Sequence, residues 1–310
     1  MVRNATMATP RLLQRQWHAC RVTSQPATTT LSSRLNAASF TTAPPRQQKS
    51  TSSTITLSKP HTVDPRWLTI IKRRIGKCLM FGLQPAQVDE AGLILRRIAN
   101  DWRELIAGSE GFLTDETRRA VYRHNVVWGE MDVMGHVNNV TYLRYAETAR
   151  VNLMRNYAIH IDPAHKTEWL NTVGNRGIGL ILQSIKLDYK FPMTWPDKIT
   201  VYHRLTQDPA VTLSQSSFQQ EVLILSEAKQ RPAARCIEHN VIYDYKLLRR
   251  APSPPVFILD QFKRTWELQE QSKRKWQQRI ADIENKVRAL ELDSWDREDA
   301  VEMLGSAVKS

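Results

Sequence analysis

Hydrophobic and polar positions from residue 140 to residue 157 follow a helical period. The apolar positions recur at three- and four-residue steps: Tyr142, Ala146, Ala149 and Leu153. This spacing predicts a helix with one apolar face. Asn138 and Asn139 lie just before it, where an asparagine side chain can accept from the free amides of the first turn. The preceding stretch from Trp128 to Gly135 reads as a tight turn that carries an acid.

Alternating apolar and polar positions predict β-strands on both sides of this helix. One strand is expected before the helix and about four after it, at residues 120–128, 181–191, 198–206, 211–225 and 237–245. The strand at 211–225 is long enough to need a bulge. One long helix with an antiparallel sheet indicates an α+β fold.

Helical periodicity returns towards both ends of the chain. Residues 62–119 read as a helical N-terminal extension, with helices near 66–74 and 87–106. A C-terminal helix is expected at 258–296, because nine positions from 262 to 290 step by four and three and seven of them are apolar. Gln269 and Lys273 interrupt that register. It fits either a coiled coil or, in the plainer interpretation, a helix packed on its own domain or on a second copy.

The first 60 residues differ in composition from the rest of the chain. They contain eight Arg and Lys residues, many Ser and Thr, and no acid before Asp64. This is the composition of a mitochondrial transit peptide, and a disordered basic tail is the alternative. Removing these eight cations takes the formal net charge from +13 to +5. The basic balance is therefore not evidence of nucleic-acid binding, although Lys273-Arg274-Lys275 leaves a weak RNA-binding alternative. For the basic helix near 66–74, a role at a membrane surface is a minor alternative.

The remaining composition fits one folded unit with extensions. The chain has 310 residues, of which 41% are hydrophobic. Three widely spaced cysteines offer neither a disulfide framework nor a paired-cysteine metal site. No apolar run approaches the ~18 residues of a membrane span. The eight histidines lack metal-ligand spacing, and neither a serine-nucleophile elbow nor a phosphate or dinucleotide loop is present. We therefore expect no metal and no cofactor.

The acid turn and the helix after it carry a resemblance to a known family. The residues concerned are Gly135-His136-Val137-Asn138-Asn139, Tyr142, Tyr145, Glu147 and Ala149-Arg150. They are similar to the signature of 4-hydroxybenzoyl-CoA thioesterase-like proteins, and the chain resembles a mitochondrial, fungal-type member with extensions at both ends. The resemblance implies a hot-dog fold, in which an antiparallel sheet wraps one long helix, at residues 120–250. It implies a thioester hydrolase, with coenzyme A or an acyl carrier protein arriving as part of the substrate.

The resemblance also assigns roles to residues of the motif. Asp132 corresponds to the acid that attacks the thioester or activates water, with stabilisation of its own turn as the alternative. Asn139 and His136 are the further catalytic candidates, although some relatives carry a histidine where this chain has Asn139. Such a catalyst needs donors aimed at the developing oxyanion, which free amides at the helix start supply. The substrate-binding candidates are Asn138, Val140 and Glu147.

Three functions remain open on this evidence. The first is hydrolysis of an acyl thioester in the mitochondrion, and the second is a hot-dog domain retained as a binding or scaffold module in a mitochondrial assembly. A dehydratase of the same fold is the weakest. The resembled enzymes form their active sites between two copies, so a homodimer or a tetramer is expected. In the motif itself, Glu130 is interpreted as structural, and Glu147 is placed one helical step from Arg150, where the two could pair.

Overall fold

The computed structural model describes residues 64–212 and 216–303. The proposed transit peptide at 1–60 lies outside these residues. The α-helices are α1 (Trp67–Met80), α2 (Pro85–Ile106), α3 (Asn139–Asn156), α4 (Lys166–Asn171), α5 (Pro209–Thr212) and α6 (Val256–Asp293). The strands are β1 (Val121–Asn125), β2 (Ile178–Tyr189), β3 (Lys198–Leu205), β4 (Ser217–Ser226), β5 (Arg231–Asp244) and β6 (Arg249–Arg250). Short helical segments occupy Gly108–Glu110 (η1), Trp128–Glu130 (η2), Tyr157–Ile161 (η3) and Pro163–His165 (η4).

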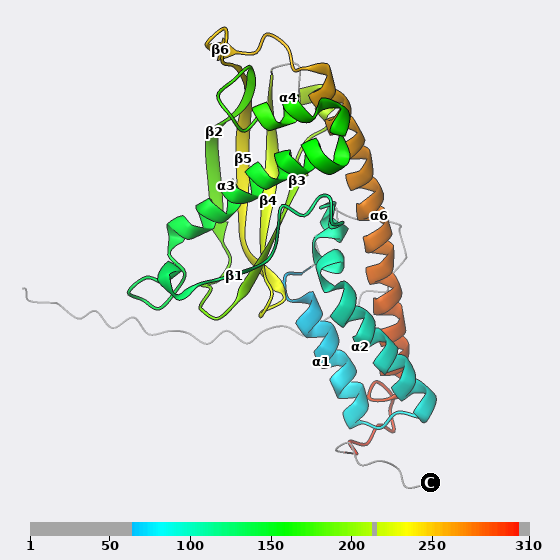
Figure 1. Ribbon diagram of the computed structural model, residues 1–310. Helices are drawn as coiled ribbons and strands as arrows, with labels where there is room; N and C mark the ends of the chain where they lie inside the picture. Colours follow the sequence, from blue (N-terminus) through cyan, green and yellow to red (C-terminus); the bar gives the residue numbers. More distant parts are fainter. Residues whose placement is uncertain (1–63, 213–215, 304–310) are drawn as a thin grey trace, which may run out of the picture. The chain divides into compact units, whose positions relative to one another are not determined.

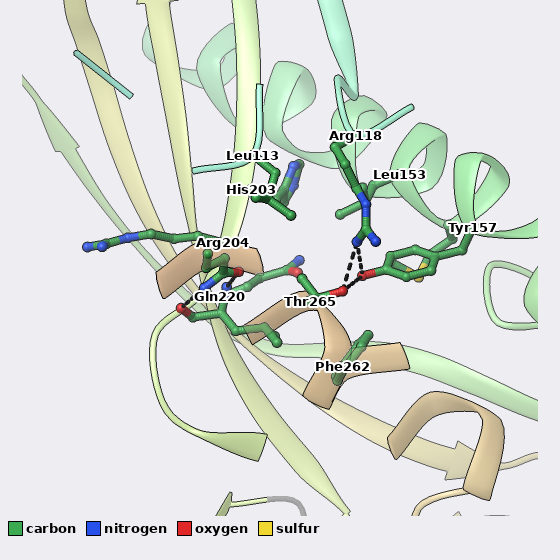
Figure 2. A pocket seen from close by; sticks show the side chains of 12 residues that line it. Leu113, Arg118, Leu153, Tyr157, His203, Arg204, Gln220, Phe262 and Thr265 are labelled. Carbon is green, nitrogen blue, oxygen red and sulfur yellow. Dashed lines mark hydrogen bonds between the residues drawn. The ribbon is translucent and has the colours of Figure 1, made fainter. Parts of the chain in front are cut away.

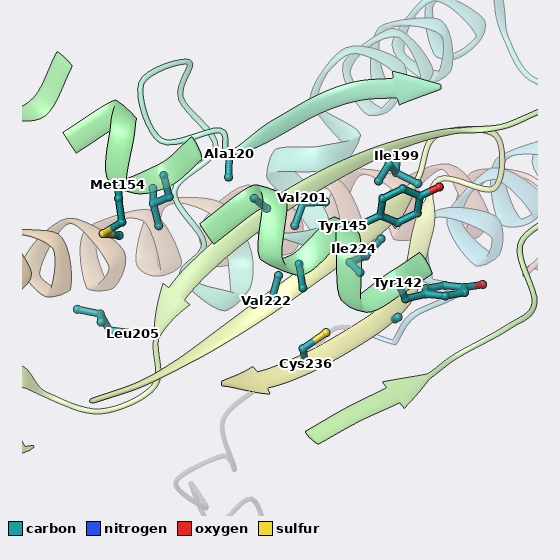
Figure 3. Close-up of a cluster of buried hydrophobic side chains, with 14 of the residues drawn as sticks. Ala120, Tyr142, Tyr145, Met154, Ile199, Val201, Leu205, Val222, Ile224 and Cys236 are labelled. Carbon is teal, nitrogen blue, oxygen red and sulfur yellow. The ribbon is translucent and has the colours of Figure 1, made fainter. Parts of the chain in front are cut away.

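The strands form one antiparallel sheet in the order β1-β3-β4-β5-β2, with β6 paired to the end of β5. The long helix α3 runs across this sheet (Figure 1). Its small residues Ala146 and Ala149 are fully buried in one hydrophobic cluster with side chains of the strands. Figure 3 shows Val201, Val222 and Cys236 of the strands in this cluster. Small side chains let a helix approach a sheet closely, so these alanines have a packing role. The fold expected from the sequence, an antiparallel sheet around one central helix, is confirmed.

The opposite face of the sheet packs against the helical extensions. Side chains of adjacent strand residues point to opposite faces, so Tyr202 and Leu223 face away from α3. They join a second hydrophobic cluster with residues of α1, α2 and the C-terminal half of α6. The backbone of η1 lies so close to α6 here that a Cβ on Gly108 would come within 2.4 Å of the Trp276 ring. The two extensions thus pack on the sheet rather than forming a separate coiled coil.

Helix α6 contributes to both hydrophobic clusters. Phe262 is buried near α3, whereas Ile283 and Val287 are buried with α1 and α2. Gln269, which interrupts the apolar register, is buried between these regions. Its side-chain oxygen accepts from the Leu205 amide at 2.8 Å, and its nitrogen donates to the Leu205 carbonyl at 3.0 Å. The polar residue therefore completes the end of β3 as another strand would.

Two strand predictions were wrong at their ends. The strand expected at 211–225 is a short helix, α5, followed by β4 from Ser217. Pro209 favours a helical turn, and the Asp208 carboxylate accepts from the Ala210 amide at 2.8 Å. The strand expected at 120–128 ends at Asn125, and η2 follows.

The face of β5 that contacts α3 carries polar residues. Ile237, Val241 and Tyr243 alternate along one face of β5, as predicted. The polar residues Glu238 and Asn240 on the opposite face are completely buried, although alternation alone would place polar residues on the solvent side. Glu238 meets the Arg150 guanidinium of α3 at 2.7 Å and accepts from the Gln220 amide at 2.8 Å. The pairing of Arg150 with Glu147 that their spacing allows is therefore not formed, since the partner of Arg150 comes from the sheet and Glu147 is exposed.

Within the described ranges, no helix is long and apolar enough to cross a membrane.

Candidate functional site

The acid turn is a closed backbone loop at the start of α3. Met131 and Val137 form a β-bridge across it, and the Asp132 amide donates to the His136 carbonyl at 2.7 Å. Gly135 turns the chain with a φ of +75°, a conformation that glycine adopts without strain. The Asn138 amide then donates to the Glu130 carbonyl at 2.8 Å. These bonds fix the loop beside the first turn of the helix.

The Asp132 side chain is half-buried and held by its own loop. Its Oδ1 accepts from the Met134 amide at 2.8 Å and from the His136 amide at 3.3 Å. Its Oδ2 has no hydrogen-bond partner among residues 64–212 and 216–303. One oxygen is thus tied to the turn, and the other is free to act on a bound molecule.

Glu130 supports the loop from within. Its Oε2 accepts from the Val127 amide at 2.9 Å and from the Tyr145 hydroxyl at 2.7 Å. Burial and the bond to Glu130 raise the pKa of Tyr145, so the phenol stays protonated and continues to donate. The structural interpretation of Glu130 agrees with these contacts.

The first turn of α3 offers fewer free amides than the sequence suggests. The Asn138 side chain caps the helix by accepting from the Val140 amide at 2.9 Å, and the Thr141 amide donates to the Asn138 carbonyl at 2.9 Å. The Asn139 amide has no acceptor in the described part of the chain. It is therefore the donor best placed to meet an incoming oxygen, supported by the positive end of the helix dipole.

The remaining candidates lie at different distances from this centre. The His136 side chain is half-buried in the loop, and the backbone amide of the same residue donates to Asp132. Val140 and the side chain of Asn139 are exposed at the helix start. Glu147 lies exposed more than two turns further along α3, so its assignment as a binding residue gains no support from a contact with the loop.

Aromatic residues around the loop were not among the predicted site residues. Tyr189 of β2 donates to the Asn139 carbonyl at 3.1 Å, and its ring packs edge-on against that of Tyr142. Trp128 and Trp195 contact each other edge-on with ring centroids 5.7 Å apart; Trp128 is largely exposed and Trp195 about half exposed. The local sequence pattern does not mark these residues, because their exposure and their contacts become visible only in the structure.

An open cleft of about 770 Å³ begins at the residues that lead into the loop. Val126 and Val127 line it together with Trp195 and residues of the β3 start and the turn after β4. Three cations on its walls, Arg103, Arg123 and Lys198, are accompanied by the acids Asp197 and Glu227. The cleft lies at the β1 edge of the sheet, and its lining ends at the residues just before the acid loop.

Cysteine and metal-ligating side chains add no further catalytic group to this site. Cys236 lies under α3, and burial raises the pKa of its thiol to about 12, so it is a poor nucleophile at neutral pH. In the described residues, no group of three or more His, Cys, Asp or Glu side chains is arranged to hold a metal ion.

Residues 126–262 match the model of the family described as the thioesterase-like superfamily. The match begins after β1, takes in α3 and the strands β2 to β6 and ends within α6, so it covers less than half of the chain. None of the curated proteins matches the sequence.

Three solved structures that match this chain have low sequence identity to it. A thioesterase from Thermus thermophilus, complexed with coenzyme A and zinc, is 25% identical, with 51% of this chain and 98% of that chain covered and a TM-score of 0.37. The YbaW protein from Escherichia coli is 20% identical over 48% and 96% of the two chains, with a TM-score of 0.36. The DHNA-CoA thioesterase from Staphylococcus aureus is 16% identical over 56% and 92%, with a TM-score of 0.33.

Proposed function

We propose that this protein hydrolyses acyl thioesters, with Asp132 as the reacting carboxylate. The observation that carries the proposal is the half-buried Asp132 at the start of α3, with one carboxylate oxygen held by loop amides and the other free. The thioesterase-like match of residues 126–262 supports the same reaction class. The acyl group is carried by coenzyme A or an acyl carrier protein, and no other cofactor is required.

The geometry suggests two versions of the chemistry. In the first, Asp132 takes a proton from water as the water oxygen attacks the thioester carbonyl. In the second, the carboxylate itself attacks and forms an anhydride, which water then hydrolyses. In both, negative charge develops on the carbonyl oxygen, where the Asn139 amide and the helix dipole stabilise it. In the first version the carbon–sulfur bond then breaks, and the thiolate takes the proton held by Asp132. In the second, the carbon–sulfur bond breaks as the anhydride forms, and the thiolate takes a proton from the solvent.

The test of this function is release of free thiol from a panel of acyl-CoA and acyl-carrier thioesters of different chain lengths. The purified protein should turn over at least one member well above the rate without protein. No turnover across the panel would contradict the hydrolase function.

A specific observation favours a second candidate, a binding or scaffold module. The Met134 and His136 amides both donate to Asp132, and a short acidic side chain commonly stabilises a turn in this way. These two hydrogen bonds would explain the presence of Asp132 without any catalytic role. The helical extensions also add surface that hydrolysis does not need. In that case the protein would bind a partner in a mitochondrial assembly and release no thiol.

We further expect the protein to form a homodimer or a tetramer. The strands β1 and β2 end the sheet on either side, and unpaired edges are usually covered. Exposed apolar side chains also gather around the acid loop: Trp128, Val133, Met134, Val140, Tyr189 and Trp195. Light scattering at micromolar concentration should give at least twice the mass of one chain. A stable monomer would count against an active site shared between copies.

The proposed location is the mitochondrion. The acid-free, Arg- and Ser-containing segment before Asp64 motivates this proposal. Mass spectrometry of the protein from its native cells should find an N-terminus between about residues 30 and 62, as import with processing requires. An intact Met1 on protein recovered from the cytosol would contradict it.

A further inference from the structure

A small cavity lies under the C-terminal half of α3, away from the acid loop. Its volume is about 20 Å³, and its walls come from five parts of the chain: the segment before β1, α3 with η3, β3, β4 and α6. Figure 2 shows the side chains of Arg118, Tyr157 and Thr265 pointing toward one another, and His203 of β3 also lines the cavity. The proposed hydrolysis uses none of these residues.

Arg118 brings a buried positive charge to the cavity without an acid to balance it. The residue is 7% exposed. Its Nη1 donates to the Tyr157 hydroxyl at 3.0 Å and to Thr265 Oγ1 at 2.8 Å, and the guanidinium carbon lies 5.1 Å from the centre of the Tyr157 ring. No carboxylate of residues 64–212 or 216–303 forms an ion pair with it. A buried charge is normally paired, because removing it from water is costly.

Other arginines in the fold show what a paired guanidinium looks like here. Arg150 and Arg235 each meet a carboxylate at 2.7 Å, from Glu238 and Glu221 respectively. Arg204, the second cation on the cavity wall, is 2.6 Å from Glu221. Each of these three arginines thus has a carboxylate partner, whereas Arg118 has none in the described structure.

His203 adds two unused polar atoms to the same cavity. The residue is 7% exposed, and neither ring nitrogen has a hydrogen-bond partner in the described structure. Burial lowers the pKa of His203 to about 4, so the ring is neutral at pH 7 and one nitrogen carries a hydrogen. The nearby Gln220 amide is already engaged, because it donates to Glu238 at 2.8 Å. Arg118 and His203 therefore leave donors available for a guest.

We propose that this cavity is a binding site for one small anion, a halide or a carboxylate no larger than formate, held by Arg118. The charge of the guest follows from the unbalanced guanidinium. Its size follows from the volume, since about 10–15 Å³ by this measure holds one water-sized atom. A neutral His203 can donate to the anion with its protonated nitrogen. The bound anion joins residues of α6 to α3 and the sheet, so it stabilises the packing of the C-terminal helix on the core.

The first test measures thermal unfolding of the full chain in sodium bromide, sodium formate or sodium gluconate at equal ionic strength. Gluconate is too large for the cavity. Bromide and formate should raise the Tm with the logarithm of their concentration, by roughly 5 °C at one hundred times the Kd. Arg118→Met should remove this difference between salts. Arg144→Met, which changes an exposed arginine of α3, should keep it.

The second test does not depend on the stability of a variant. Crystals of the wild-type protein soaked in bromide should show an anomalous peak within hydrogen-bond distance of the Arg118 guanidinium. Equal Tm values for the wild type in all three salts, or a cavity that holds only water after the soak, would overturn the proposal. Neither readout depends on thioester turnover, so the result is independent of the proposed hydrolysis.

Discussion

Asp132→Asn is expected to lower thioester turnover by at least ~100-fold, or about 2.7 kcal/mol of activation free energy. An amide can neither take a proton from water at neutral pH nor attack a thioester as a carboxylate does. In the wild type, the Met134 and His136 amides donate to Asp132 Oδ1. The side-chain oxygen of asparagine can accept the same two hydrogen bonds. The substitution therefore removes the chemistry of the carboxylate and keeps its role in the loop. Thiol release by both proteins, across medium- and long-chain acyl-CoAs, measures the effect.

Two controls separate catalysis from folding. The melting temperature of Asp132→Asn should stay close to that of the wild type, because the loop bonds persist. Thr148→Ala, an exposed change on the same helix, should leave turnover close to that of the wild type. His136→Ala should cost less than Asp132→Asn unless that side chain shapes the loop. Equal turnover by Asp132→Asn and wild type would leave Asp132 with a structural role only and favour the scaffold function.

Glu238→Gln is expected to destabilise the fold by roughly 3 kcal/mol, which corresponds to a Tm lower by roughly 10 °C. The carboxylate is completely buried and meets a guanidinium whose side chain is only 12% exposed. Neutralising it leaves the Arg150 charge under α3 without a counter-charge, and this is costly even though glutamine has nearly the same shape. Thermal or urea unfolding measures the change.

A second substitution tests the cause of that loss. Adding Arg150→Met to Glu238→Gln should recover part of the stability, because the buried charge is then gone. The matched control is Glu147→Gln, which should change the free energy of unfolding by less than about 0.5 kcal/mol. If Glu147→Gln were as destabilising as Glu238→Gln, the Arg150 charge would be balanced by Glu147 of the helix as much as by Glu238 of the sheet.

Local patterns in the sequence were sufficient for the parts of the fold that local physics decides. The spacing of Tyr142, Ala146 and Ala149 predicts α3, and its N-cap is Asn138, as the preference of asparagine for that position suggests. The acid loop was predicted in the same way, because Gly135 and the residues around it specify a turn within a few positions. Alternation also indicated β2 and β3 to within about three residues, whereas β5 begins at Arg231, well before the strand expected at 237–245.

The errors concern contacts between residues far apart in the sequence. Arg150 has a near neighbour of opposite charge in Glu147, yet its partner is Glu238, which is 88 positions away. The apolar alternation in β5 gave no sign that Glu238 and Asn240 face the central helix. A buried polar residue becomes predictable only when its partner is known, and that partner is set by strand register. The same limit hid Arg118 and His203, whose common cavity depends on five separate segments.

The site is predictable in part for the same reason. The motif places Asp132, but which helix amide remains free depends on how Asn138 uses its side chain, and this leaves the Asn139 amide rather than that of Val140. The contact of Tyr189 with the Asn139 carbonyl depends on the position of β2 beside the helix start.

Helix α6 has a consequence for how the protein unfolds. Its N-terminal part is buried with the central helix and its C-terminal part with α1 and α2, and its 38 residues form one continuous helix. Separating the extensions from the sheet would expose apolar surface in both clusters at once. We therefore expect a single unfolding transition in calorimetry, and amide hydrogens of α1 and α3 that exchange with similar protection.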